Sequence, residues 1–300
     1  MKIQPYGGWQ QCAFLEKGGV QVWVSLEVGP RILHASLEGE PNLLAEVAEQ
    51  RGATGGEEWR LYGGHRFWIA PEDPELTYQP DNDPVEHQWD GSTLLLRQAP
   101  EALTGLRKEL AIELLEERAV RLLHRIVNES DRPHLLAPWA LTCMAPGGRC
   151  LIPNEPVLSH EEALLPARSM ALWSYTDLRD DRFRFRDGFL ELRQDPAATG
   201  PQKIGMLNRQ GWAAYLLGRQ AFVKQFPALP DAVYPDFGCN CEFFTNAEML
   251  EMESLGPLVE LQPGETVEHP EHWAFRPISG EIGEGEMARL PETFGLAPAS

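Results

Sequence analysis

The stretch VQVWVSLEV, residues 20–28, predicts the fold class of this chain because its aliphatic side chains recur at every second position. A period of two is the pattern of a half-buried β-strand. Similar runs, separated by short clusters of Gly, Pro, Asp or Asn, cover residues 31–37, 93–98, 120–127, 183–185, 189–192, 211–217 and 221–225. This rhythm favours antiparallel sheets packed face to face over alternating strands and helices.

We therefore predict an all-β protein, a large antiparallel β-sandwich. Chains of 300 residues often form one such domain. We expect a single domain over residues 1–300, with a core at about 10–277 and a loose C-terminal tail at 278–300.

Two segments allow more than one interpretation. Residues 101–117 could form an amphipathic helix with leucines on one face, but Leu110, Ile112 and Leu114 also alternate with Glu109 and Glu113. We prefer a hairpin that turns at residues 116–118. Residues 161–170 are expected to form a short helix or an irregular loop.

The charge of the chain restricts its partners. Lys and Arg total 26 against 45 Asp and Glu, a formal net charge of −19, which repels nucleic acid and anionic membranes. A neutral ligand such as a sugar meets no such repulsion. The sequence has no apolar stretch of membrane-spanning length, no signal-peptide pattern at its start, and an odd number of cysteines, five. These features predict a cytoplasmic protein.

Two carboxylates stand out within an apolar segment near the C-terminal end of the chain. Glu251 and Glu253 lie two residues apart, so an extended backbone places both on one face, and Glu242 on the preceding strand is a possible third member. A carboxylate whose pKa is raised by burial and by neighbouring charge suits general base catalysis. The alternative is that these glutamates simply face water at the edge of a sheet.

The segment LYGGHRFWIAPE, residues 61–72, combines a Gly-Gly loop with polar and aromatic side chains. His65 and Arg66 point to opposite faces if the segment is extended. Donors beside the aromatic plane of Trp68 suit a sugar, which offers both hydroxyl groups and an apolar C–H face. The alternative is a tight turn that enters a core strand, with His65 hydrogen-bonded locally.

Other candidates are weaker. Lys203 and Lys224 are two of only five lysines and lie in strand-like segments, although a surface lysine with a partly buried stem is the simpler account. The cysteines at 239 and 241 and the histidines at 269 and 272 match no zinc-binding spacing. Nucleophile-elbow, phosphate-loop and dinucleotide motifs are also missing from the sequence. We predict neither a metal nor a cofactor.

Several motifs together resemble a known family. A Leu-x-Gly-Gly loop at 61–64, Leu-Glu-Met-Glu at 250–253 and Leu-x-Pro-Gly-Glu-Thr at 261–266 are similar to segments of the aldose 1-epimerase (galactose mutarotase-like) superfamily. The segments GGHR-x-W at 63–68 and ESLGPL at 253–258 resemble its bacterial branch. The likeness extends over about residues 19–275. It implies a large antiparallel β-supersandwich with a sugar-binding cleft on a concave sheet.

The resemblance also implies roles for individual residues. Glu251 matches the catalytic base of the family. Both family histidines are replaced: Tyr62 stands at the position of the sugar-binding histidine, and the Ala-Pro-Trp-Ala segment at 137–140 lacks the acid histidine. We therefore expect His65 to be the catalytic acid, with Tyr62 second. The residues expected to bind the substrate are Tyr62, Arg66, Trp68, Trp139, Lys203, Asn240, Glu242 and Glu253.

Three functional hypotheses remain open at this point. The first is an enzyme that interconverts sugar anomers by general acid and base catalysis. The second is a non-catalytic sugar-binding or sensing protein. The third is a carbohydrate-active hydrolase or lyase that uses paired acids. In each case we expect a small-molecule sugar as partner and a monomer or homodimer.

Overall fold

The computed structural model describes residues 1–186, 188–229 and 231–278 of the chain. The predicted tail at 278–300 lies outside the described residues except for Ile278. Almost all regular structure is β-strand, as the two-residue period predicts, and the helical structure among the described residues is a single 3-10 turn, Ala48–Gln50. No helix in the described ranges is both long and apolar enough to cross a membrane.

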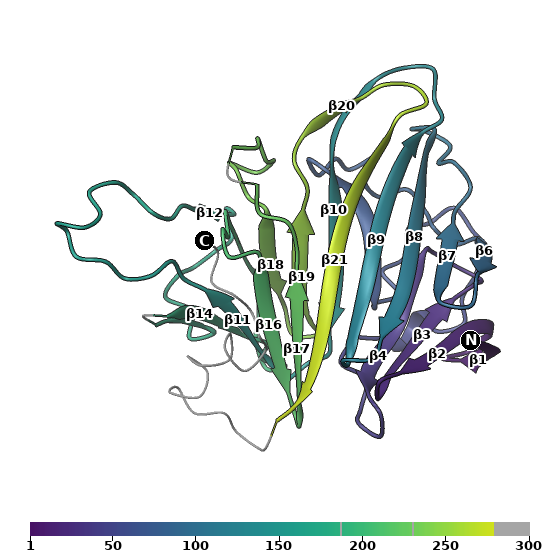
Figure 1. Cartoon of the computed structure of the whole chain (residues 1–300), viewed down its shortest axis with the longest axis horizontal. Coiled ribbons are helices and arrows are strands. Elements are labelled where there is room, and N and C mark those ends of the chain that lie inside the picture. The colour runs from purple at the N-terminus through teal and green to yellow at the C-terminus, as the bar shows by residue number, and fades with distance from the viewer. Residues whose placement is uncertain (187, 230, 279–300) are drawn as a thin grey trace.

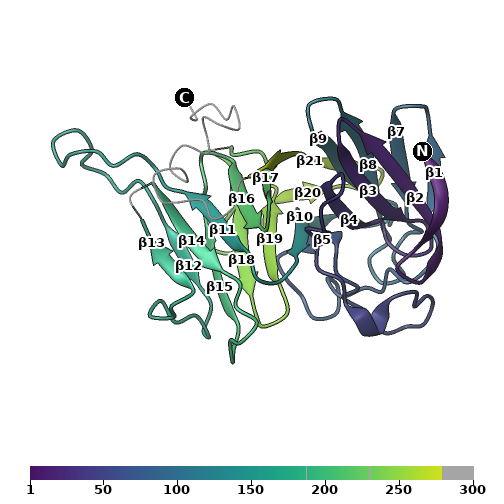
Figure 2. The ribbon, with the colours of Figure 1, turned by 90° about the horizontal axis from the view of Figure 1, so that it is seen from below.

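The strands form two large antiparallel sheets that face each other (Figures 1 and 2). The first sheet, which we call sheet A, follows the order β1 (Lys2–Tyr6), β2 (Trp9–Lys17), β3 (Val20–Ser25), β4 (Arg31–Leu37), β5 (His65–Ala70), β10 (His134–Met144), β19 (Leu250–Leu255), β18 (Cys241–Thr245), β15 (Gln202–Met206) and β12 (Met170–Leu172), with β20 (Val259–Leu261) also paired to β10.

The second sheet, sheet B, has ten strands. Its order is β13 (Phe183–Phe185), β14 (Phe189–Arg193), β11 (Arg149–Pro153), β16 (Trp212–Leu217), β17 (Gln220–Gln225), β21 (Thr266–Pro277), β9 (Ala119–Asn128), β8 (Leu106–Leu115), β7 (Thr93–Arg97) and β6 (Glu86–Trp89). The predicted β-sandwich is confirmed.

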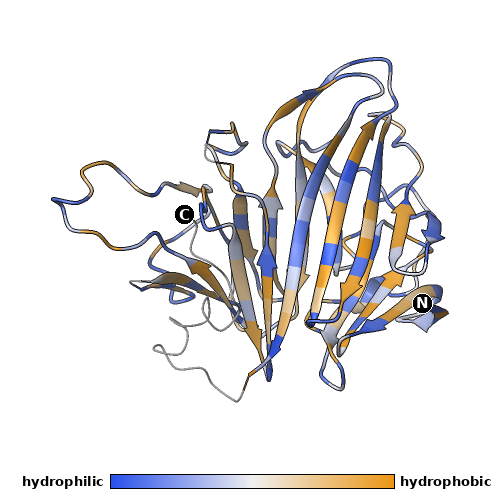
Figure 3. Ribbon diagram, in the orientation of Figure 1, coloured by the Kyte–Doolittle hydropathy of each residue, from blue (hydrophilic) through white to orange (hydrophobic). Residues whose placement is uncertain are grey.

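The main hydrophobic core lies between the two sheets. Most strands contribute alternate residues to it, and Figure 3 shows the resulting stripes of polar and apolar residues along β8 and β9. Strand β3 supplies Val20, Val22 and Val24, all fully buried. The strand is shorter than its sequence pattern indicates. It ends at Ser25, because the Ser25 hydroxyl accepts the backbone N–H groups of Glu27 and Val28 and so turns the chain.

The two ambiguous segments are also resolved. Residues 106–128 form the predicted hairpin of β8 and β9, in which Leu110, Ile112 and Leu114 face the core. Arg118 takes a left-handed φ of 57° in the turn between the strands. Residues 161–169 form an irregular loop that leads into β12, and it contains no helix.

Candidate functional site

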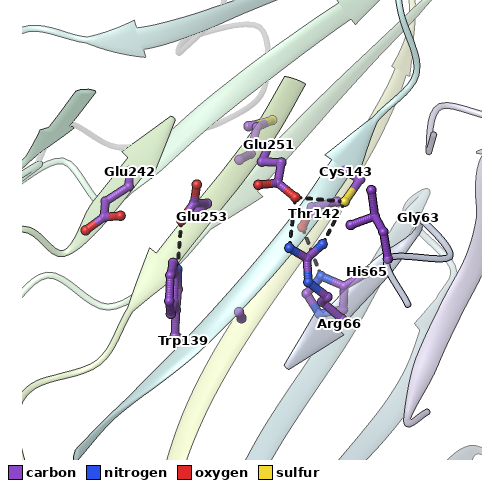
Figure 4. Close-up of polar contacts among 12 residues, drawn as sticks. Gly63, His65, Arg66, Trp139, Thr142, Cys143, Glu242, Glu251 and Glu253 are labelled. Atoms are coloured by element: carbon purple, nitrogen blue, oxygen red, sulfur yellow. Dashed lines mark hydrogen bonds and ion pairs between the residues drawn. The ribbon is translucent and has the colours of Figure 1, made fainter. Parts of the chain in front are cut away.

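Strand β19 lies in the interior of sheet A, and its two faces have different surroundings. Leu250 and Met252 point between the sheets into the main core. Glu251 and Glu253 point the other way, to what we call the outer face of sheet A (Figure 4). The neighbouring strands β5, β10, β15 and β18 add further side chains to this face. Together they form an outer-face cluster, which we define as Arg66, Lys203, Glu242, Glu251 and Glu253.

Glu251 is held by a cation and a thiol. Arg66 donates from Nη2 to Glu251 Oε1 at 3.0 Å and from Nη1 to Cys143 Sγ at 2.9 Å. The Cys143 thiol donates to the same Oε1 at 3.1 Å. Both contacts to the carboxylate go to Oε1, and the Glu251 side chain keeps 10% of its surface exposed. Oε2 is therefore the oxygen of Glu251 that a ligand can reach.

Glu242 and Glu253 share one ammonium group. The Lys203 Nζ atom lies 2.7 Å from Glu242 Oε2 and 3.2 Å from Glu253 Oε2. Trp139 also donates its indole N–H to Glu253 Oε2 at 2.8 Å. The remaining oxygen of each carboxyl, Oε1, is buried and has no hydrogen-bond partner among the described residues. Buried polar atoms without a hydrogen-bond partner are rare inside proteins.

The local charges shift the pKa values of the three acids in different directions. Burial opposes ionisation of Glu251, but Arg66, the Cys143 thiol and Lys203 outweigh burial and lower its pKa. Burial raises the pKa of Glu242 well above its usual value and also raises that of Glu253, and the Lys203 ammonium offsets this only in part. Glu251 is thus ionised at neutral pH, whereas Glu242 and Glu253 favour holding a proton.

Aromatic side chains surround the cluster. The Arg66 guanidinium lies 4.3 Å from the Trp68 ring centroid, and Lys203 Nζ lies 5.0 Å and 4.6 Å from the centroids of Trp139 and Trp173. Trp68 and Trp139 pack edge to face at 5.4 Å. Such planes can pack against the C–H face of a sugar ring. The predicted neighbours Arg66, Trp68, Trp139, Lys203, Glu242, Glu251 and Glu253 are therefore all brought together on one face.

Sequence reasoning missed several residues of this face. Cys143 was not singled out, and three aromatic side chains, Trp59, Tyr78 and Trp173, come from loops without a periodic pattern. One signal for Trp173 was present in the sequence: the glycine at position 205, within β15. Gly205 faces Glu242 across the β15–β18 pair, and a Cβ atom there would lie 3.3 Å from the Trp173 ring and 2.7 Å from Cys239 Sγ. A side chain at 205 would crowd both neighbours.

The prediction for His65 as catalytic acid needs correction. His65 starts β5 next to Arg66, and alternation turns its ring to the opposite face, between the sheets. It is fully buried there. Its Nδ1 atom is hydrogen-bonded to Thr142 Oγ1 at 2.9 Å, and its Nε2 atom to His124 Nε2 at 2.7 Å. The two glycines before it allow a close approach of neighbouring backbone segments. A Cβ atom at Gly63 would lie 2.2 Å from the Ala45 carbonyl oxygen, and one at Gly64 would lie 2.1 Å from that of Ile32.

His65 belongs instead to a second group of polar side chains. This inter-sheet cluster is defined as His65, His124, Lys224, His269 and Glu271, all fully or almost fully buried. Lys224 Nζ lies 2.8 Å from Glu271 Oε1 and also donates to Thr142 Oγ1 and to two backbone carbonyls of sheet A. Lys224 is therefore a buried structural cation, not a surface lysine.

The hydrogen bonds of the inter-sheet cluster fix the ring protons. Lys224 donates to Thr142, so the threonine hydroxyl proton is free to reach His65 Nδ1. His65 then carries its proton on Nε2 and donates to His124 Nε2, and His124 donates from Nδ1 to the His269 carbonyl. His65, His124 and Glu271 are close enough together to hold a metal ion. Each of these donor groups, however, already has a protein partner.

Two further predicted substrate contacts are not part of the outer-face cluster. The Tyr62 hydroxyl donates to Asn82 and accepts from Arg60, and its ring packs in a separate group with Trp9. Asn240 is fully buried and exchanges two hydrogen bonds with the backbone of Asn208. Both side chains hold loops in place, which corrects their predicted place in the site.

Comparison with known proteins supports the fold and gives a family. The family model described as a domain of unknown function (DUF4380) matches residues 70–276, more than half of the chain. The chain belongs to this family. None of the curated proteins matches it significantly.

Solved structures with the same fold cover almost all of the chain. A candidate aldose 1-epimerase from Klebsiella pneumoniae is 13% identical, with a TM-score of 0.61, covering 98% of this chain and 86% of its own. The Slr1438 protein from Synechocystis is 13% identical, with a TM-score of 0.58 and coverage of 92% and 99%. A galactose mutarotase-like protein from Lactobacillus casei is 8% identical, with a TM-score of 0.55 and coverage of 88% and 100%. The galactose mutarotase-like fold expected from the sequence motifs is confirmed.

Proposed function

We propose that this protein binds a neutral sugar on the outer face of sheet A and interconverts its α and β anomers. The observation that carries the proposal is the position of Glu251. Its ionised carboxylate keeps one oxygen available, beside further carboxyl oxygens without partners and a group of tryptophan rings. Such a mixture of acceptors and aromatic planes suits a polyol. Solved proteins of this fold described as candidate aldose 1-epimerases support the same choice.

The reaction needs one proton removed and one supplied. Glu251 takes the proton of the anomeric hydroxyl through Oε2, and the O–H electron pair becomes the second bond of a C1 carbonyl. The bond between C1 and the ring oxygen breaks, and that oxygen keeps its electron pair and accepts a proton from an acid. Rotation about the C1–C2 bond and the reverse steps then give the other anomer.

The charges of the outer-face cluster favour a neutral substrate. Arg66 is engaged by Glu251, and Lys203 is engaged by two carboxyl groups. A phosphate or carboxylate on the sugar would have to compete with these buried acids for the two cations. A neutral sugar only needs to donate its hydroxyl protons to acceptor oxygens, which the cluster offers.

A second candidate is a sugar-binding protein without catalytic activity. It is favoured by one observation: within the described residues, none of the members of the outer-face cluster, and none of the groups that they hydrogen-bond or pair with, is a histidine, the residue that most often moves protons in enzymes. This protein would keep the binding face and lack the acid.

One experiment separates the two candidates. Magnetisation exchange between the α and β anomeric protons of several neutral aldoses is measured by NMR with and without the protein. We expect faster exchange with the wild type and a loss of about 10²–10⁴-fold in Glu251→Gln. The matched control is Glu101→Gln, which changes another buried glutamate beside a lysine, Lys108, outside the site. Saturable binding without faster exchange supports the non-catalytic candidate, and neither binding nor exchange rejects both.

A further inference from the structure

The cross-strand pair Glu242 and Glu253 is an unusual arrangement of two acids. The two residues are direct partners in the β18–β19 register, and their relative exposures are 0% and 1%. Like charges placed directly opposite each other in a sheet are destabilising. Such a pair is stable only when its negative charge is balanced. The single positive charge of Lys203 balances only one of the two carboxylates.

A count of charges over the whole cluster gives the same result. The three carboxyl groups of Glu242, Glu251 and Glu253 face two cations, Arg66 and Lys203. Fully ionised, this buried group would carry one uncompensated negative charge, which is costly in a region of low polarity. A single proton on the Glu242–Glu253 pair removes the excess. Burial, which raises the pKa of both acids, acts in the same direction.

The pair also has atoms free for chemistry. Oε2 of each carboxyl contacts Lys203, whereas Oε1 of each is buried without a partner in the described part of the chain. Neither Oε1 atom is therefore tied to a protein group, and either can carry the shared proton. Glu253 is two residues from Glu251 on the same face, about 6.6–6.8 Å along the strand. An acid and a base at this separation can flank one sugar ring.

We infer that Glu242 and Glu253 share one proton and that this carboxyl dyad is the general acid of the site. The inference rests on the proposed function and replaces the imidazole that sequence reasoning expected. In the reaction the dyad gives its proton to the ring oxygen as the bond to C1 breaks, and it becomes a pair of carboxylates held by Lys203. Ring closure returns the proton to the dyad, so that no other reactant is consumed.

The shared proton can be tested without any sugar. Infrared spectra of the ligand-free protein at pH 7 should contain the C=O stretch of a protonated, buried carboxyl group, shifted in D₂O. Glu242→Gln and Glu253→Gln should each remove the band, because the single remaining acid is ionised beside Lys203. Glu101→Gln should leave it unchanged. A wild-type spectrum without this band, or a band that survives both substitutions, overturns the inference.

The catalytic role is tested by anomer exchange. We expect Glu242→Gln and Glu253→Gln each to slow exchange by about 10²–10⁴-fold. In the wild type the rate should fall at alkaline pH as the dyad loses its proton. If Glu251→Gln abolishes exchange while both dyad variants keep the wild-type rate and pH profile, the dyad is not the acid, although the proposed function stands. If the wild type itself does not accelerate exchange, the proposed function fails, and the infrared band still decides whether the proton is shared.

Discussion

Two polar clusters flank sheet A, one between the two sheets and one on its outer face, and on strand β5 they are only one residue apart. His65 faces the inter-sheet cluster, and its neighbour Arg66 faces the outer-face cluster (Figure 4). Both clusters are buried and rich in charge. They differ in how completely their polar atoms are satisfied.

The inter-sheet cluster is closed on itself. Ser254 donates to Glu271 Oε1 at 2.5 Å and accepts from His269 Nε2 at 2.7 Å, and the Trp273 indole donates to Glu271 Oε2 at 2.8 Å. The outer-face cluster, by contrast, leaves Oε1 of Glu242 and Oε1 of Glu253 buried with neither a hydrogen bond nor an ion pair within the described residues, and it carries one excess acid. A buried network whose polar atoms all have hydrogen-bond partners tends to fix a fold. A network with unpaired polar atoms can still bind a further group. We therefore assign stability to the first cluster and function to the second.

The largest expected effect on stability is at the centre of the inter-sheet cluster. Lys224→Met leaves Glu271 buried without its counter-ion and should lower the free energy of unfolding by about 3–5 kcal/mol, measured by urea denaturation. The control is Lys17→Met, which removes a surface ion pair to Glu116 and should cost less than about 1 kcal/mol. Equal losses in the two variants would mean that the inter-sheet cluster does not stabilise the fold.

Acidification should act on the inter-sheet histidines. Burial lowers the pKa of His269 from 6.5 to about 3, so the folded protein keeps this ring neutral while the unfolded chain binds a proton below pH 6.5. Stability contributed by the neutral ring is therefore lost as the pH falls, by about 2 kcal/mol between pH 7.5 and 5. When the free energy of unfolding is measured by urea denaturation, that of His269→Gln should fall by about 2 kcal/mol less than that of the wild type between pH 7.5 and 5. A pH dependence identical to wild type would contradict the buried neutral state.

The outer-face dyad should respond with the opposite sign. The folded protein holds a proton on Glu242 and Glu253 that the unfolded chain releases above its ordinary pKa, so this contribution to stability falls as the pH rises. The stability of Glu242→Gln relative to wild type should then grow by about 1.4 kcal/mol between pH 5.5 and 6.5. A difference that stays constant over this range would argue against the shared proton.

The smallest effect concerns the aromatic side chains around the outer-face cluster. Trp173→Leu removes one plane beside Lys203 and should weaken sugar binding by about 0.5–1.5 kcal/mol, or about 2- to 12-fold in the dissociation constant. Calorimetric titration measures this change. Trp89, partly buried on the far sheet, offers a matched substitution, and Trp89→Leu should leave the dissociation constant unchanged.

The period of two predicted much of this arrangement. It placed Glu251 and Glu253 on one face, put His65 and Arg66 on opposite faces, and identified the hairpin at residues 106–128. It could not tell which of the two faces of β5 looks inward, because His65 and Arg66 are both polar. The inward face is set by contacts with Thr142 and His124, far away in the chain.

Other parts of the site depend on tertiary contacts that leave no periodic signal. Trp173 approaches Lys203 from a loop, and the room for it comes from the missing side chain at Gly205. The excess of acids over cations depends on the position of Lys203 between Glu242 and Glu253, which results from the pairing of β15 with β18. The alternation within a strand is a local property, whereas pairing between distant strands is not.

The two clusters each contain an indole N–H that can report on ligand binding. Trp139 donates to Glu253 in the outer-face cluster, and Trp273 donates to Glu271 in the inter-sheet cluster. Indole ¹⁵N–¹H signals, assigned with Trp139→Phe and Trp273→Phe, should be followed while neutral aldoses are titrated. We predict a saturable shift of the Trp139 signal with an unchanged Trp273 signal. A sugar that binds and shifts Trp273, or leaves Trp139 unmoved at saturation, would contradict the assignment of function to the outer face.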